Sequence, residues 1–169
     1  MRLCGKIVFD KIMPVIEIEI QINAPVERVF DLARCIDLHE ETMAKSNEKA
    51  VGGVREGLIG LGETVTWQAT HFGIRQKLTS KITAFDRPFY FQDAMVKGAF
   101  KRFTHDHYFT LQGDTVLMRD RFEYASPLRI LGKIADALFL ENYMKNLLTE
   151  RNLLIKKIAE SADWRKFLD

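Results

Sequence analysis

The feature that most restricts the fold is a long central run of alternating residues, followed by a segment with helical spacing. From about Asn47 to Tyr124, apolar residues recur at every second position, and glycines such as Gly73, Gly98 and Gly113 separate the runs. This alternation is typical of half-buried strands, and the short turns between them favour an antiparallel meander. A doubly wound nucleotide-binding fold is disfavoured because neither a βαβ pattern nor a glycine-rich phosphate loop occurs.

The residues before this run predict one further strand and two short helices. Val15–Asn23 alternates strictly, with four isoleucines on one face, as expected for a half-buried first strand. The phrase NAPVERVFDLAR follows, and its apolar residues recur at the spacing of a short amphipathic helix. We expect a second short helix around Ile36–Ala44.

The residues after the run predict a long C-terminal helix. Ser126 and Pro127 form a favourable helix start, and no further proline occurs up to about residue 162. The apolar stripe is broken at Leu140–Tyr143, so we expect a short helix that runs into a longer one. The residues of the stripe are Leu131, Ile134, Leu138, Leu147, Leu154 and Ile158.

Together these elements predict an α+β fold with a single domain. We expect a curved antiparallel β-sheet of about seven strands that grips the long C-terminal helix, with two short helices after the first strand. The boundaries that we expect are an N-terminal extension at 1–13, one domain at 14–162 and a C-terminal tail at 163–169. One helix covers a concave sheet only in part, so a cavity between the two is expected.

Charge and hydropathy exclude several kinds of partner. The formal net charge is +2, from 25 basic and 23 acidic residues spread along the chain, so nucleic acid is not an expected partner. No apolar run approaches the roughly 18 residues of a membrane span, and no secretory signal precedes the first strand. Cys4 and Cys35 form no disulfide framework, so a reducing cytoplasm is the expected compartment. The oligomeric state stays open.

Two stretches of the chain carry a resemblance to a known family. INAPVERVFDLA resembles the opening phrase of the SRPBCC superfamily, the START-like or pollen-allergen-like helix-grip proteins. A later pattern resembles a bacterial subgroup of predicted ligand-binding SRPBCC proteins, some of which are labelled cell-division inhibitors. The residues of that pattern are Gly98, Phe100, His105, His107, Phe109, Asp120, Arg121, Tyr124 and Pro127. The resemblance covers about residues 14–160 and implies the helix-grip fold, whereas the superfamily is functionally diverse.

Polar residues on three predicted strands are candidates for chemistry. His105 and His107 alternate on one strand, so both imidazoles point to the same face. Asp120 lies on the inner face of the next strand, and His71 on that of a third. A pair of His105 with Asp120 would satisfy two polar groups inside an apolar concavity. This pair is open to three interpretations: a structural contact, a recognition site for a ligand, or an acid and base if the protein is an enzyme.

The His-x-His spacing also permits a metal site. A third ligand would come from His71, Asp93 or Asp120. The spacing is a weak signal by itself, and we expect neither a metal nor a cofactor.

The expected cavity defines a set of ligand-binding candidates and three classes of function. The classes are a binding protein for a small hydrophobic molecule such as a lipid, isoprenoid or polyketide, a cyclase or dehydratase that uses His105 and Asp120, and a regulatory interaction protein. Contacts to the ligand are expected from Trp67, His71, Phe91, Phe103, His105, His107, Asp120, Phe122, Tyr143 and Leu147.

Two groups of charges remain. Lys97, Lys101 and Arg102 form a small basic cluster, which is either a solvated edge or an entrance that attracts an anionic headgroup. On the last helix, Glu150 and Arg151 are expected to be surface charges.

Overall fold

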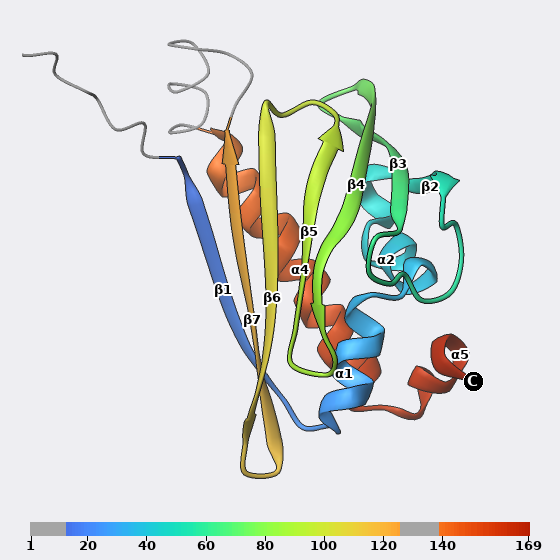
Figure 1. The fold of residues 1–169 in the computed structure, drawn as a ribbon, viewed down its shortest axis with the longest axis vertical. Helices are drawn as coiled ribbons and strands as arrows, with labels where there is room; N and C mark the ends of the chain where they lie inside the picture. The colour runs from blue at the N-terminus through green and yellow to red at the C-terminus, as the bar shows by residue number, and fades with distance from the viewer. Residues whose placement is uncertain (1–12, 126–138) are drawn as a thin grey trace, which may run out of the picture.

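Seven antiparallel strands form one sheet in the order β1-β7-β6-β5-β4-β3-β2, and the sheet curves around the long helix α4 (Figure 1). The computed structural model describes residues 13–125 and 139–169. The strands are β1 (Val15–Ile22), β2 (Lys49–Gly53), β3 (Thr64–His71), β4 (Ile74–Asp86), β5 (Tyr90–Lys97), β6 (Arg102–Gln112) and β7 (Thr115–Ala125). The α+β fold and the curved sheet predicted from the sequence are therefore confirmed.

The helices lie on the concave side of the sheet and at its lower end in Figure 1. The two short helices predicted after the first strand are present, and the long C-terminal helix covers the sheet. The helical elements are α1 (Val26–Ala33), α2 (Ile36–Thr42), η1 (Ala44–Ser46), α4 (Glu141–Ala159), η3 (Ala162–Trp164) and α5 (Arg165–Leu168). In the part of the chain that the structure describes, no helix has the length and apolar character needed to cross a membrane.

Several expectations fall on residues that the structure does not describe. Cys4, most of the expected extension at 1–13, and the expected helix start at Ser126 and Pro127 lie outside the described residues. The described part of the expected C-terminal helix is α4, which begins at Glu141. The expected tail at 163–169 forms η3 and α5, and Trp164, Phe167 and Leu168 pack against the core.

Turns of two residues set the register of the neighbouring strands. The hairpin predicted at the end of β3 is confirmed: Phe72 and Gly73 form its turn with positive φ angles of 54° and 76°, and His71 pairs with Ile74. Positive φ at both positions suits the right-handed twist of the strands. A similar turn at Gly113 and Asp114 joins β6 to β7.

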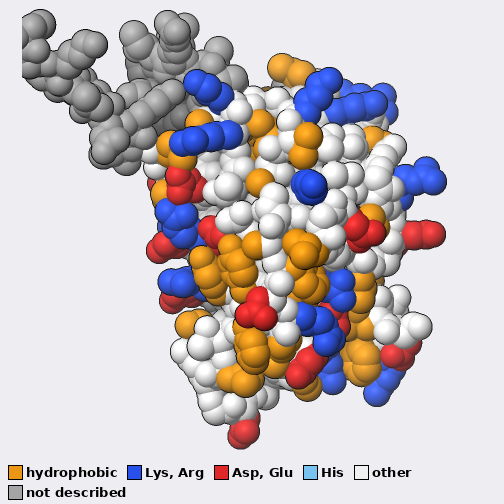
Figure 2. Space-filling view, in the orientation of Figure 1, with side chains coloured by type: hydrophobic (Ala, Val, Ile, Leu, Met, Phe, Trp, Pro, Cys, Tyr) orange, Lys and Arg blue, Asp and Glu red, His pale blue; other side chains and the backbone are white. Residues whose placement is uncertain are grey.

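The two faces of the sheet differ in chemistry, which decides where the core forms. On the outer face, basic residues of β7 stand opposite acidic residues of β1, as Glu17 does with Arg121 and Glu19 with Arg119. Red and blue side chains therefore lie close together over β1 and β7 in Figure 2. The isoleucines of β1 face the other way, where Ile16 and Ile22 are buried. The inner face thus carries the apolar surface that α1 and α4 cover.

Phe30 of α1 is the centre of the core at the lower end of the sheet. Its side chain is fully buried, and the rings of Phe85, Phe91 and Phe109 lie 5.3, 5.5 and 5.3 Å from its own, all edge-on. Edge-on packing is the favourable arrangement of aromatic rings. This cluster fixes α1 on the sheet and closes the protein interior at that end.

We predict that Phe30→Ala lowers the free energy of unfolding by about 3–5 kcal/mol, because it removes a buried ring and leaves a cavity. The matched control is Phe89→Ala, since Phe89 is 47% exposed and its loss is expected to cost about 0.5 kcal/mol. Urea unfolding curves with equal slopes measure both values. Equal losses for the two variants would contradict the central role of Phe30.

Candidate functional site

A cavity of about 500 Å³ lies between the inner face of the sheet and the helices α1, α2 and α4. Its volume is in the range of sites for small molecules. All ligand-binding candidates except Asp120 line it, and most of the wall is aromatic or aliphatic. These lining residues are Trp67, His71, Phe91, Phe103, His105, His107, Phe122, Tyr143 and Leu147.

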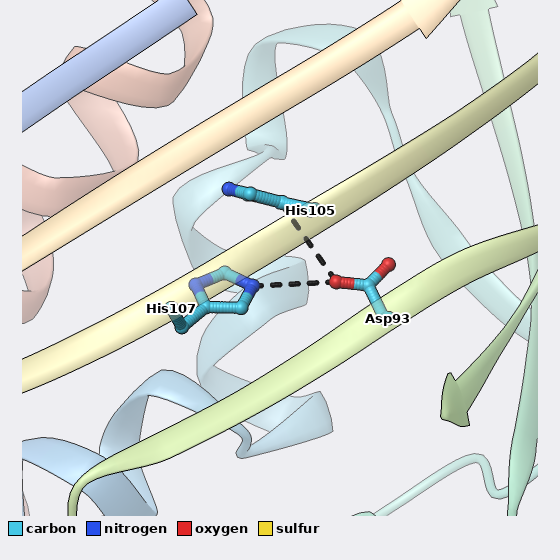
Figure 3. A group of neighbouring side chains, drawn as sticks. All are labelled: Asp93, His105 and His107. Atoms are coloured by element: carbon cyan, nitrogen blue, oxygen red, sulfur yellow. Dashed lines mark hydrogen bonds and ion pairs between the residues drawn. The ribbon is translucent and has the colours of Figure 1, made fainter. Parts of the chain in front are cut away.

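Polar groups gather at one place in this apolar wall, on three neighbouring strands. Asp93 comes from β5, His105 and His107 from β6, and their side chains point toward one another (Figure 3). Asp120 on β7 lies behind His107. The register brings them together, because Asp93 stands opposite His105, and His107 stands opposite Asp120. We call these four residues the polar cluster.

His107 lies between two carboxylates. Its Nδ1 is 2.8 Å from Asp120 Oδ1, and its Nε2 is 3.2 Å from Asp93 Oδ1. His105 is more loosely placed: its Nδ1 is 3.8 Å from Asp93 Oδ1, and its Nε2 is 3.7 Å from Asp120 Oδ2. Among the described residues, His105 Nε2 has no hydrogen-bond partner.

The hydrogen-bonded partner of Asp120 is therefore His107, whereas the sequence analysis paired Asp120 with His105. The reason is the register, since Phe122 and not Asp120 stands opposite His105. Counting back from the two-residue turn at Gly113 and Asp114 would have found the correct pair. Asp93 offered no such signal, because the longer connection between β5 and β6 does not fix a register by itself.

The helix α4 contributes two more polar groups to Asp120. Asn152 Nδ2 donates to Asp120 Oδ2 at 2.8 Å, and Arg151 Nη1 lies 3.3 Å from the same oxygen. Arg151 Nη2 also donates to the carbonyl oxygen of Ala33 at 2.8 Å. The carboxylate of Asp120 thus connects β7 to α4, and the guanidinium of Arg151 connects α4 to the end of α1.

Arg151 is thus a buried residue, only 4% exposed, and the expectation that it is a surface charge is wrong. Its neighbour Glu150 does lie outside, where it pairs with Lys45 at 2.8 Å. The helical spacing contained the signal, because Arg151 follows Leu148 by three positions and precedes Ile155 by four. A charge on this inner stripe is stable because Asp120 faces it.

Burial and neighbouring charges shift the pKa values of the residues in the polar cluster in different directions. Burial alone would raise the pKa of Asp120, but the charge and the hydrogen bond of His107, with the nearby His105, hold it well below its usual value. For His107, burial opposes the charged form, yet Asp120 and Asp93 raise its pKa. Burial and the neighbouring His107 lower the pKa of His105. At neutral pH, His105 is therefore the neutral imidazole that lines the cavity.

The remaining polar residues of the cavity wall form separate pairs. His71 does not join the polar cluster: its Nδ1 lies 2.7 Å from the hydroxyl of Tyr143. His39 Nε2 lies 2.9 Å from Glu48 Oε1, and its ring stacks on Trp67 with centroids 4.1 Å apart. Sequence reasoning missed His39 and Glu48, since neither lies on an alternating strand.

Three residues of the polar cluster have donor atoms close enough to share a cation. Atoms of Asp93, His105 and His107 all lie within 4.8 Å of one another. Among the three candidates for a third metal ligand, only Asp93 meets both histidines on the cavity side.

The basic cluster predicted from the sequence is exposed. Lys97, Lys101 and Arg102 all lie at the surface. Ala99 and Phe100, between them in sequence, line the cavity. Attraction of an anionic headgroup to this edge stays a prediction.

Comparison with known proteins identifies the fold. No protein-family model matches the chain, and no curated protein sequence does. Among solved structures, TTHA0849 from Thermus thermophilus has a TM-score of 0.66 and 18% identity, covering 84% of this chain and 97% of that one. Major latex-like protein 151 from Panax ginseng has a TM-score of 0.65 and 13% identity, covering 88% and 99%.

A third solved structure is a norcoclaurine synthase mutant from Thalictrum flavum, in complex with a transition-state analogue. Its TM-score is 0.62 at 12% identity, and the match covers 86% of this chain and 96% of that one. These similarities show that the chain has the helix-grip fold that its sequence predicts. Membership of the SRPBCC superfamily, and of its bacterial subgroup, stays a prediction.

We predict that Asp120→Ala lowers the free energy of unfolding by about 3–5 kcal/mol, because it leaves His107 and Arg151 buried without their carboxylate. Asp120→Asn is expected to lose less, since it keeps an oxygen acceptor. The control is Glu150→Ala, which breaks an exposed ion pair worth about 1 kcal/mol or less. Urea unfolding tests all three, and a loss in Asp120→Ala no larger than in the control would refute the role of Asp120.

Proposed function

We propose that the protein binds a small hydrophobic molecule in the cavity between the sheet and α4. The observation that carries this proposal is the composition of the cavity wall: aromatic and aliphatic side chains cover most of it, and a few polar groups interrupt it, namely the polar cluster and the two separate pairs described above. Sites for small molecules have this composition, in which apolar area supplies affinity and a few polar groups fix orientation. The helix-grip fold of the solved neighbours supports it as well.

The distribution of polar groups also favours a particular ligand chemistry. The apolar body of the ligand lies against rings such as Phe103 and Phe122. At the polar cluster, a ligand hydroxyl donates to Asp93, or a carbonyl or carboxyl oxygen accepts from the imidazole N–H of His105. A lipid, an isoprenoid or a polyketide-like chain fits this description. A strongly charged ligand does not, because burial of each further unpaired charge against this wall is costly. We place this activity in the domain at 14–162 and in the cytoplasm.

We predict that Ser80→Phe weakens binding of the neutral dye Nile red by at least about tenfold, because the new ring fills part of the cavity. Ser80 is buried on β4 and lines the cavity. The matched control is Thr83→Phe on the same strand, where the side chain is exposed. Dye fluorescence gives the affinities, and thermal melting shows that both variants are folded.

Equal affinities in Ser80→Phe and Thr83→Phe would contradict a ligand in the cavity. Failure of folded wild-type protein to bind Nile red, or to release it to a long-chain acid or alcohol, would contradict the proposal as a whole. That result would favour the third class, a regulatory interaction protein.

A second candidate function, a cyclase or dehydratase, is favoured by the state of His105. This imidazole is buried, neutral and in the cavity wall, so it can accept a proton from a bound substrate. We predict for an enzyme that His105→Phe, which keeps an aromatic ring, reduces turnover of a polyketide-like substrate about 100-fold or more while binding persists. Unchanged turnover in this variant would exclude His105 as the base.

A further inference from the structure

We propose that Asp93, His105 and His107 bind a divalent metal ion of the zinc type in the cavity wall. The proposal does not depend on an apolar ligand, because the three donor groups belong to the protein alone. It rests on three features of the polar cluster: the distances around one oxygen of Asp93, the position of Asp120 behind the imidazoles, and the balance of buried charge.

The first feature is the convergence of two imidazole nitrogens on one oxygen. His107 Nε2 lies 3.2 Å and His105 Nδ1 lies 3.8 Å from Asp93 Oδ1. A hydrogen bond between an imidazolium and a carboxylate is about 2.7–2.9 Å long, as the contact of His107 with Asp120 is at 2.8 Å. Both contacts of Asp93 are longer than that.

These longer distances fit ligands that share a metal ion. In a tetrahedral zinc site with bonds of about 2.0–2.1 Å, neighbouring ligand atoms lie about 3.3 Å apart. The separations of 3.2 and 3.8 Å bracket this value. The donor atoms of all three residues lie within 4.8 Å of one another, on the neighbouring strands β5 and β6.

The second feature is Asp120, which faces the far nitrogen of each imidazole. Its Oδ1 accepts from Nδ1 of His107, and its Oδ2 lies 3.7 Å from Nε2 of His105. Histidines that bind metals usually direct their other nitrogen to a carboxylate in this way. The arrangement leaves Nε2 of His107 and Nδ1 of His105 to face Asp93. His105 Nε2 has no hydrogen-bond partner among the described residues. The carboxylate of Asp120 is therefore the group toward which this nitrogen is directed.

The third feature is the charge. With both imidazoles neutral, the carboxylates of Asp93 and Asp120 face a single guanidinium, that of Arg151. Unmatched buried charge is unfavourable, and a cation bound between Asp93, His105 and His107 would match the charge of the second carboxylate. Imidazole nitrogens with one carboxylate suit zinc and similar transition-metal ions better than magnesium or calcium.

Three protein ligands leave at least one coordination position for another group. Since Asp93, His105 and His107 all line the cavity, this position is available to a molecule inside it. The metal ion would hold a carbonyl or carboxyl oxygen of such a molecule, or a water molecule with a lowered pKa.

The test uses untagged full-length protein, stripped with a chelator and then titrated with zinc by calorimetry. We expect one zinc ion per chain. Asp93→Asn and His105→Phe should each weaken zinc binding at least about tenfold, by analogy with losses at other zinc sites. The matched control is Asp106→Asn, because Asp106 lies between the two histidines in sequence but bonds to Tyr90 and Gln92 instead. It should bind zinc as the wild type does.

A folded wild-type protein that binds no zinc, or variants that bind it as tightly as Asp106→Asn does, would overturn the proposal. If the variants do not fold, X-ray absorption of the zinc-loaded wild type decides, with two imidazole ligands expected and any other number contradicting the assignment. No dye or lipid is present in these experiments, so their outcome is separate from that of the binding experiments with Nile red.

Discussion

The carboxylate of Asp120 is the interaction on which the arrangement of sheet and helix depends. It is fully buried, so it must be matched by charge and hydrogen bonds or the fold loses several kcal/mol. His107 meets it from the neighbouring strand, and Arg151 and Asn152 meet it from α4. Apolar packing alone would let the helix slide along the sheet, whereas these directional contacts fix its position.

The cavity follows from this attachment. The helix is held to the sheet at Asp120 and, further along, by apolar residues such as Ile155 that belong to the same core cluster as Phe30. Toward its beginning, Tyr143 and Leu147 line open space instead of filling it. The same contacts therefore create the space and place a polar group at its edge. The polar cluster therefore lies near the point where the helix is held, while His39, Glu48 and His71 line other parts of the wall.

The fold was predictable from the sequence because alternation and helical spacing are local properties. The alternating isoleucines predict the strand β1, and Phe72 with Gly73 predicts a turn. In both cases a few neighbouring residues are sufficient for the prediction. Most cavity residues could be found in the same way, since a residue such as Phe103 or Phe122 shares its strand face with its neighbours at every second position.

Pairing between strands and between layers was harder to predict. The contact of His107 with Asp120 depends on register, and the place of Asp93 depends on a connection that no simple turn rule describes. Arg151 resembles a surface charge in the sequence because its partner lies on a strand 31 residues earlier in the chain. A buried charge can be recognised only when the opposite charge that faces it is known, and that information is tertiary.

Native mass spectrometry of freshly purified protein tests the central claim, a cavity that holds a small hydrophobic molecule, most directly. We expect that the wild-type protein retains a small apolar molecule, which denaturation releases, and that Ser80→Phe carries much less of it. A bare chain mass for both proteins, or the same bound mass on both, would contradict it.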